Sequence, residues 1–423
     1  MATVLVVSEG SGISSALKLA DEGHVVRVHL TSKEQKDTLK GLRNPSLIGT
    51  VPKNLDPFDV ILFDGYGNGV LAERFKEKDK PVIGSGSFND KLELDREYGT
   101  KVVETLLKDL ALPKSKTCKT AEEAISYLKE VKKPQVLKPF GNQPTYLTPV
   151  SETADNEVLV QMVKVLGQGT LLPCLIQEKV TGVEVSTEGW FDGASFSHLN
   201  HTIERKRLLE GDKGPMLGCA GNVVWTATYD KLFEVALLPL TELLQKVDYL
   251  GPIDVNCICT KDKAYFLEFT PRFGHDALQA LTELMRKPFF DYLWALQMKR
   301  ELPPFRSEYS IAVRLTLPPH PYDLKDIFKN YEGMKVFNIP VEARRHIHLY
   351  DVKFEEGEPV TAGVDGCLGC VTARGETIRE CRRRVYRTIK NITQTQDVQY
   401  RLDIGEGMDK DIEKLKEWGW IDV

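Results

Sequence analysis

The chain has 423 residues, of which 42% are hydrophobic and 28% charged, and its formal net charge is −5. This length predicts two to four globular domains, and the acidic balance argues against electrostatic binding of nucleic acid. The apolar run Met1–Val7 ends at Ser8-Glu9-Gly10, too short for a signal peptide or a membrane span. We therefore expect a cytoplasmic protein with reduced cysteines. We also expect a monomer or homodimer.

The N-terminal region predicts a Rossmann-like βαβ unit. Strands are expected at Thr3–Val7 and Val25–Leu30 on either side of a helix, and further parallel strands at Asp59–Phe63 and Pro81–Ile83. The turn Gly10–Ser15 has no third glycine of a dinucleotide fingerprint, and no acid ends the second strand. Both departures argue against NAD binding and favour a scaffold that binds another ligand.

The rest of the chain alternates helices and strands. Helices are predicted at Leu92–Leu110, Ala121–Val131 and Leu232–Val247, and strands at Gln135–Lys138, Leu175–Val180 and Val183–Trp190. A hairpin is expected from Ile253–Thr260 and Tyr265–Phe269. After a Pro-rich boundary at 302–305, a final α+β unit contains an amphipathic helix with the apolar residues Ile378, Cys381, Val385, Ile389 and Ile392.

The strongest local signal for chemistry is the hairpin around Asp254 and Glu268. Side chains alternate along a strand, so Glu268, Thr270 and Arg272 are expected on one face, with Asp254 on the partner strand. Two such carboxylates can bind one or two Mg²⁺ ions, or Mn²⁺, together with nucleotide phosphates. An arginine beside them can stabilise a phosphoryl group during transfer. The alternative is a set of ordinary ion-paired strand residues.

A second signal is the polar connector Gln177-Glu178-Lys179-Val180 between two strands, followed by Glu184. Connector backbone can bind an adenine edge, and a carboxylate can accept hydrogen bonds from ribose hydroxyls. Lys101 and Lys138 are candidates for phosphate contacts, because an ammonium is a compact charge. The alternatives are an exposed hairpin and two solvated surface lysines.

Two other patterns are interpreted as structural. Cys367-Leu-Gly-Cys370 is a lone CxxC without a second Cys or His pair nearby, and Cys257 and Cys259 alternate inside a strand. The arginines at 382–384 and 387 are typical of the solvated face of a helix, with a phosphate site as the alternative.

Several landmarks in order resemble the ATP-grasp superfamily, and within it the phosphoribosylamine–glycine ligases. The ordered nucleotide-side positions are Lys101, Lys138, Gln177–Val180, Glu184, Asp254 and Glu268. Leu267–Gly274 is similar to the family motif LEFNxRFGDPE, and Glu204–Pro215 resembles DHKRxxDGDxGP. The family landmarks TAG, GET and YRxDIG have counterparts at Val360–Gly363, Gly375–Thr377 and Tyr400–Gly405.

This resemblance implies an α/β ATP-grasp fold with four parts. They are an N-terminal Rossmann-like domain (1–118), a lid subdomain (119–182), a central ATP-grasp domain (183–305) and a C-terminal α+β domain (306–423). It also implies an ADP-forming ligase: ATP phosphorylates a carboxylate to an acyl phosphate, and an amine then attacks it. The implied small-molecule substrates are glycine or a related carboxylate and an amine.

The resemblance also implies roles for individual residues. The nucleotide would be bound by Lys101, Lys138, Gln177, Glu178, Lys179, Val180 and Glu184. The metal would be held by Asp254, Glu268 and Thr270, and the substrate would contact Asp212, Gly214 and Arg272. Arg272 and Lys206 would be catalytic, with Arg272 stabilising the acyl phosphate.

The chain departs from the family where the amine should bind. Glu9–Ser15 replaces the family's GGREHAL, and Asp64–Gly69 replaces GPEAPL. The lid sequence Lys138–Pro144 is changed, and Thr270 stands where the family has a metal-binding Asn. The open alternatives are a ligase for a different amine, an authentic phosphoribosylamine–glycine ligase of purine biosynthesis with a diverged N-terminal site, and a nucleotide-binding protein without catalysis.

Overall fold

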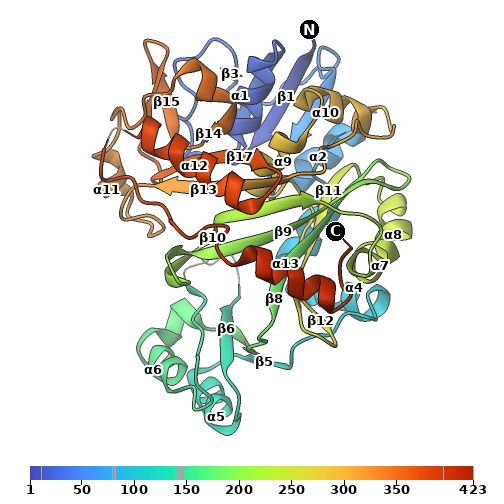
Figure 1. Ribbon diagram of the computed structural model, residues 1–423, viewed down its shortest axis with the longest axis vertical. Coiled ribbons are helices and arrows are strands. Elements are labelled where there is room, and N and C mark those ends of the chain that lie inside the picture. Colours follow the sequence, from blue (N-terminus) through green and yellow to red (C-terminus); the bar gives the residue numbers. More distant parts are fainter. Residues whose placement is uncertain (11, 79, 81, 141–146, 394, 423) are drawn as a thin grey trace.

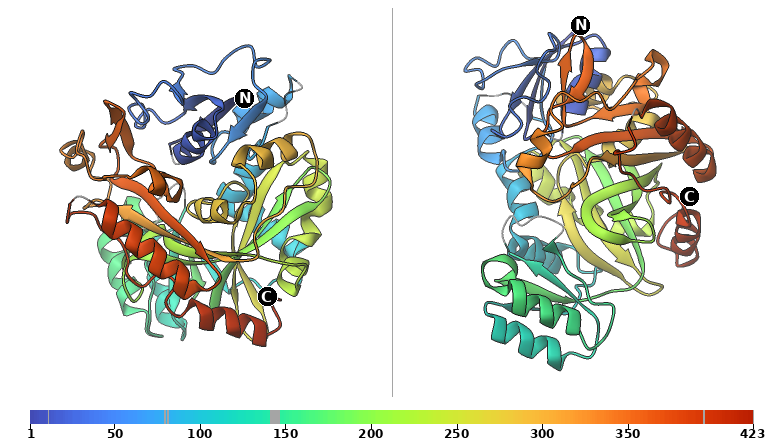
Figure 2. Two further views of the ribbon diagram at one scale, coloured as in Figure 1. Left: turned by 45° about the horizontal axis from the view of Figure 1, so that its top comes forward. Right: turned by 90° about the vertical axis from the view of Figure 1, so that its left-hand side faces the viewer.

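The computed structural model describes residues 1–423 except 11, 79, 81, 141–146, 394 and 423. The described strands form sheets of four, three, eight and two strands. Figure 1 and the second view of Figure 2 show the N-terminal sheet at one end of the molecule and the three-stranded sheet at the other. The eight-stranded sheet lies between them.

The N-terminal sheet has the order β3-β2-β1-β4. Its strands are β1 (Thr3–Ser8), β2 (Val25–Leu30), β3 (Ser46–Leu47) and β4 (Val60–Phe63). β1 pairs in parallel with both β2 and β4, which confirms the predicted parallel unit. Ile83 adds only a single parallel bridge to Leu62. The chain turns from β1 towards β2 on one side while β4 lies on the other, so the carboxyl ends of β1 and β4 form a topological switch point.

Four helices accompany this sheet: α1 (Ile13–Asp21), α2 (Gly69–Lys76), α3 (Ser87–Leu94) and α4 (Arg96–Leu106). The single helix predicted at Leu92–Leu110 was wrong, because the chain breaks at Asp95 between α3 and α4. Asp95 adopts an extended conformation, and its side chain accepts a hydrogen bond from the backbone amide of Tyr98. Aspartate at this position favours a new helix start over continuation.

The three-stranded sheet has the order β5-β7-β6 and its own apolar core. Its elements are β5 (Ser115–Cys118), α5 (Ala121–Glu130), β6 (Gln135–Pro139), α6 (Glu157–Leu166) and β7 (Cys174–Glu178). A capping box between Thr120 and Glu123 fixes the start of α5. Of the predicted lid sequence, Gly141–Pro144 lies outside the described residues.

The eight-stranded sheet has the order β12-β11-β8-β9-β10-β13-β17-β14. Its strands are β8 (Val183–Phe191), β9 (Phe196–Leu209), β10 (Lys213–Thr226), β11 (Gly251–Cys259), β12 (Ala264–Thr270), β13 (Tyr309–Thr316), β14 (Ile347–Leu349) and β17 (Cys367–Gly375). β11 and β12 form the predicted hairpin. β10 pairs with β13, so one sheet runs across the expected boundary at 305. The domain limits remain predictions.

The remaining helices and a small hairpin lie around this sheet and the N-terminal sheet. They are α7 (Lys231–Ala236), α8 (Thr241–Lys246), α9 (Ala277–Leu284), α10 (Phe289–Gln297), α11 (Lys325–Lys329), β15 (Val352–Glu355), β16 (Glu358–Thr361), α12 (Ile378–Ile392) and α13 (Met408–Glu417). The single helix predicted at Leu232–Val247 was wrong, since Pro239 separates α7 from α8 within a 3₁₀ turn.

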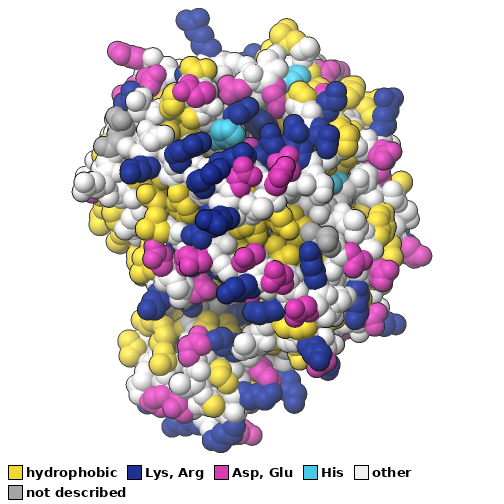
Figure 3. All heavy atoms as spheres, viewed as in Figure 1, with side chains coloured by type: hydrophobic (Ala, Val, Ile, Leu, Met, Phe, Trp, Pro, Cys, Tyr) yellow, Lys and Arg dark blue, Asp and Glu magenta, His cyan; other side chains and the backbone are white. Residues whose placement is uncertain are grey.

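The amphipathic α12 was predicted correctly, and all five of its predicted apolar residues are buried. Lys and Arg side chains lie in a band across the face that carries α12, with acidic side chains among them (Figure 3). All eight cysteines are free thiols. Within the described residues, no helix is long and apolar enough to cross a membrane.

Candidate active site

One face of the large sheet carries a polar patch built by cross-strand register. Asp254 on β11 pairs with Glu188 on β8 and with Thr270 on β12, while Asn256 pairs with Glu268. Directly paired residues of an antiparallel sheet share a face, and so do residues two apart along a strand. The predicted grouping of Asp254, Glu268 and Thr270 on one face is therefore present.

Lys206 on β9 joins two carboxylates on this face. Its Nζ lies 2.7 Å from Glu184 Oε1 and 3.1 Å from Glu268 Oε1. Burial alone would lower the pKa of Lys206, but Glu184, Glu268 and Glu204 together raise it well above its usual value. Lys206 in turn is the main cause that lowers the pKa of Glu268 to about 2. The predicted catalytic lysine thus contacts the predicted ribose and metal ligands.

Three further acids on this face have raised pKa values; Glu188 and Asp254 are buried, and Glu204 is half-buried. Burial raises the pKa of both Glu188 and Glu204 to about 7. Burial, and then the charges of Glu188 and Glu204, raise the pKa of Asp254 well above its ordinary value. Crowded carboxylates of this kind favour a bound cation, which restores their ionised forms.

The oxygens of the patch suit a hard cation. Asp254 Oδ1 and Asn256 Oδ1 are buried and have no hydrogen-bond partner in the part of the chain that the structure describes. The described residues contain no group of three or more His, Cys, Asp or Glu arranged to hold a metal ion. Mg²⁺ commonly takes one or two protein carboxylates and completes its shell with water and phosphate oxygens. Asp254 and Glu268, with Asn256 beside them, fit that pattern.

The three-stranded sheet contributes Lys138 from β6. Burial lowers the pKa of Lys138 to about 8, against the opposing charge of Glu268. Arg96 at the start of α4 also acts electrostatically on both Lys138 and Glu268. Lys101, one turn further along α4, is exposed. The structure thus brings Lys138 and Arg96 to the patch, and the assignment of Lys101 stays a prediction.

The connector Gln177-Glu178-Lys179-Val180 links β7 of the small sheet directly to β8 of the large sheet. The backbone amides of Glu178 and Lys179 donate to the carbonyls of Lys114 and Pro134, at 2.8 and 2.9 Å. The side chains of Glu178 and Lys179 form ion pairs with Lys133 and Glu152. An adenine edge would therefore have to bind connector carbonyls or the amide of Val180.

Arg272 follows β12 and ties the patch to the N-terminal part of the chain. Its Nη2 and Nε donate to Glu93 on α3 at 2.8 and 3.1 Å. Its guanidinium lies 5.5 Å from the ring centroid of Tyr66, and its Nη1 donates to the Phe273 carbonyl. The predicted catalytic arginine is thus held in one orientation by a carboxylate and an aromatic ring.

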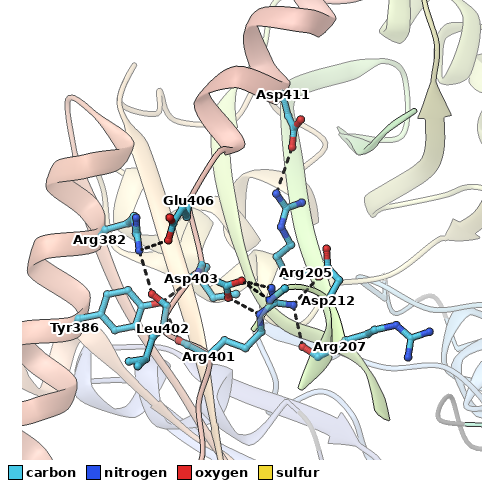
Figure 4. Close-up of polar contacts among 12 residues, drawn as sticks. Arg205, Arg207, Asp212, Arg382, Tyr386, Arg401, Leu402, Asp403, Glu406 and Asp411 are labelled. Carbon is cyan, nitrogen blue, oxygen red and sulfur yellow. Dashed lines mark hydrogen bonds and ion pairs between the residues drawn. The ribbon is translucent and has the colours of Figure 1, made fainter. Parts of the chain in front are cut away.

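Asp212 lies in the β9–β10 turn and Gly214 at the start of β10, and Arg401 binds Asp212 and so ties this turn to the C-terminal segment (Figure 4). Arg401 is 1% exposed, and its Nη1 donates to Asp212 Oδ1 at 2.7 Å and to the Arg207 carbonyl at 3.1 Å. Its Nε bonds Asp403 at 2.7 Å. The assignment of Asp212 and Gly214 as substrate ligands stays a prediction, because Arg401, and neither Lys206 nor Arg272, holds this turn.

Four residues of the site were missed from the sequence: Glu93, Arg96, Glu188 and Asn256. The alternation signal could have found Glu188 and Asn256, because each lies two residues from a recognised position or opposite one. No local pattern marks Glu93 or Arg96, which reach the site only through tertiary packing.

Comparisons with known proteins agree with the fold described above. The family model for the phosphoribosylglycinamide synthetase ATP-grasp (A) domain matches residues 99–277. A phosphoribosylamine–glycine ligase of Clostridium acetobutylicum is 27% identical over 433 residues, covering 96% of this chain and 100% of that protein.

This chain contains an ATP-grasp domain.

Two solved structures show the same fold. The phosphoribosylamine–glycine ligase of Thermotoga maritima matches the ATP-grasp protein with a TM-score of 0.69 at 20% identity, over 95% of this chain and 100% of that one. A biotin carboxylase–ATP complex from Campylobacter jejuni matches with a TM-score of 0.62 at 13% identity, over 99% and 97%. The mixed α/β ATP-grasp architecture expected from the sequence is thereby confirmed.

Proposed function

We propose that this ATP-grasp protein is an ADP-forming carboxylate–amine ligase that acts on glycine or a related small carboxylate in the cytoplasm. The reaction has two steps. The carboxylate attacks the γ-phosphorus of ATP and releases ADP, which gives an acyl phosphate. The amine nitrogen then attacks the acyl carbon, loses a proton and displaces phosphate, so that an amide forms.

The observation that carries this proposal is the arrangement of charges on the polar face. The large sheet carries Lys206, Glu184, Glu268 and Asp254. Lys138 of the small sheet is close enough for its pKa to be affected by the charges of Glu268, Lys206 and Glu184. Cations on both sheets can bind phosphates between them, and carboxylates can bind the metal that accompanies ATP. This is the charge pattern that phosphoryl transfer requires.

Each residue has a definite part in this scheme. Glu184 accepts hydrogen bonds from ribose hydroxyls, and Lys138 contacts phosphate oxygens. Asp254 and Glu268 would hold Mg²⁺, which when bound would neutralise charge on the phosphates. Lys206 exchanges its ion pairs with Glu184 and Glu268 for a contact with the reacting phosphoryl or carboxylate group. Arg272, held by Glu93, orients the acyl phosphate.

The second candidate is authentic phosphoribosylamine–glycine ligase. It is favoured by the full-length similarity to the Clostridium acetobutylicum enzyme. It is disfavoured by the acidic residues Glu9 and Asp64 at the positions where the family motifs carry GGREHAL and GPEAPL. The two candidates share the carboxylate-activating step and differ in the amine.

Trapping the acyl phosphate tests the shared step without knowledge of the amine. Hydroxylamine attacks acyl phosphates and yields a hydroxamate that can be measured directly. Incubation with Mg-ATP, glycine and hydroxylamine should give ADP and glycine hydroxamate in equal amounts, with other small amino acids as parallel arms. Absence of hydroxamate and of ADP with every carboxylate, in protein that is folded, would exclude the ligase and leave the non-catalytic alternative.

A further inference from the structure

Two carboxylates meet at the carboxyl ends of β1 and β4. Glu9 follows β1 and Asp64 follows β4, on either side of the switch point of the parallel sheet. In open α/β sheets this is the place where ligands bind. The site lies outside the polar patch described above.

The two side chains fill space that only glycine leaves open. A Cβ built on Gly12 would lie 0.7 Å from Asp64 Oδ2, and one built on Gly65 would lie 1.9 Å from Glu9 Oε2. Each carboxylate therefore reaches over the turn of the other strand. Two acidic groups and two glycines thus line the edge of the sheet.

Asp64 is fully buried, and among the described residues neither of its carboxylate oxygens has a hydrogen-bond partner. A buried carboxylate without a donor is costly unless a ligand supplies one. Its burial and the charge of Glu9 raise the pKa of Asp64 well above its usual value. The hydroxyl of Ser85, which follows the Ile83 bridge beside β4, is also buried and without a partner.

The nearby cation is already used. Arg272 acts on Asp64 electrostatically, but its Nη2 and Nε are bound to Glu93. Burial lowers the pKa of His275 to about 4, so this imidazole is neutral at physiological pH. The site therefore combines two acidic side chains with a neutral imidazole, and such a lining favours a ligand with N–H donors over a phosphate.

Arg272 also connects this site with the polar patch. It follows directly on β12, which carries Glu268, and it stacks over Tyr66, which lies two residues after Asp64. Arg272, which is proposed to orient the acyl phosphate, would thus also lie near a ligand bound between Glu9 and Asp64.

We propose that Glu9 and Asp64 bind the amine substrate, and that this substrate is an organic ammonium ion without a phosphate group. The proposal rests on the proposed ligase function, because it assigns the second substrate of that reaction. The ammonium gives one proton to a carboxylate before its nitrogen forms the new C–N bond and phosphate leaves.

Matched pairs of amines test the proposal in the full-length protein. The probes are ethanolamine with O-phosphoethanolamine, glucosamine with glucosamine 6-phosphate, and phosphoribosylamine as a fifth arm. Binding is measured by calorimetry and ligation by ADP release with Mg-ATP and glycine. In each pair the phosphate-free amine should bind at least about tenfold more tightly. Tighter binding of the phosphorylated members, or no binding of any phosphate-free amine, overturns the proposal.

Two variants test whether binding of the phosphate-free amines depends on Glu9 and Asp64. Asp64→Asn and Glu9→Gln keep shape but remove charge, and each should weaken binding of the phosphate-free amines by about tenfold or more. Asp56→Asn is the matched control, because Asp56 is an exposed carboxylate paired with Lys80. Unchanged amine binding in both folded site variants contradicts the assignment. Wild-type hydroxamate formation separately reports the ligase function, so a failure there is distinguishable from a failure here.

Discussion

Glu93 on α3 accepts three hydrogen bonds from Arg272, at 2.8, 3.1 and 3.2 Å, and so connects the N-terminal helices with the end of β12. Both side chains are mostly buried, at 15% and 18% exposed. Glu93, which is distant from Arg272 in sequence, therefore fixes the orientation of the proposed catalytic arginine.

Glu93→Gln should lower both stability and ligation. Loss of one charge from a largely buried pair leaves the guanidinium uncompensated, which costs about 2–3 kcal/mol of unfolding free energy. Urea denaturation measures this loss, and hydroxamate formation measures the activity. Glu97→Gln changes an exposed residue on the adjoining helix and should alter neither; equal behaviour of the two variants would show that the pair does not position Arg272.

Glu268→Gln should lower hydroxamate formation at least about 100-fold, or about 2.7 kcal/mol of transition-state stabilisation. The amide keeps the size of the side chain but loses the charge proposed to hold Mg²⁺. Because the Glu268 side chain is 58% exposed, its removal should change the melting temperature little. Glu234→Gln, an exposed change on α7, is the control. Near-normal turnover in Glu268→Gln would remove the metal assignment.

Binding of Mg-ATP should weaken as the pH rises past 8. Lys138 has a pKa lowered to about 8, so most molecules lose this charge by pH 9. If the bound nucleotide requires the charged form, the dissociation constant should rise by about tenfold between pH 7 and pH 9. Lys138→Met should bind more weakly at pH 7 and lose most of this dependence. The exposed Lys132→Met should keep it, and a wild-type constant independent of pH would contradict the role of Lys138.

The buried acid Glu188 should make the protein less stable at neutral pH than in mild acid. Its folded-state pKa of about 7 lies above its unfolded value, so the folded state binds the proton more tightly. Stability contributed by the protonated form is then lost as the pH rises from about 4.5 to 7, by roughly 3 kcal/mol. Glu188→Gln should unfold at higher urea concentration than wild type at pH 8 and at a similar concentration at pH 4.5. Parallel pH profiles of the two proteins would show that Glu188 is ionised in the folded state.

The sequence predicted the parts of the site that depend on strand alternation. Asp254, Glu268 and Thr270 share a face because register and side-chain period agree, and both can be inferred from a short hairpin. The long β9–β10 hairpin was not predicted, although it supplies Lys206 and ends in the turn that Arg401 holds. Its polar residues conceal the alternation, since several of them face the polar patch.

Helix ends and long-range ion pairs were harder to predict. An apolar periodicity continues through Asp95, so the pattern gave no sign that the residue caps α4 and presents Arg96 in place of Lys101. The pairing of Glu93 with Arg272 joins residues 179 positions apart in sequence, and such contacts depend on how the parts of the chain pack.

The continuous pairing of β10 with β13 has a consequence for dividing the chain. Residues 221–225 of β10 pair directly with residues 309–313 of β13, so a fragment ending near residue 305 would lose this partner along that part of β10. The exposed amides and carbonyls of that edge would offer a template for strand addition by a second molecule, and such a fragment would aggregate. The small sheet, by contrast, has its own core, and its described strands pair with one another, so residues 115–178 are the segment best suited to excision or replacement as a unit.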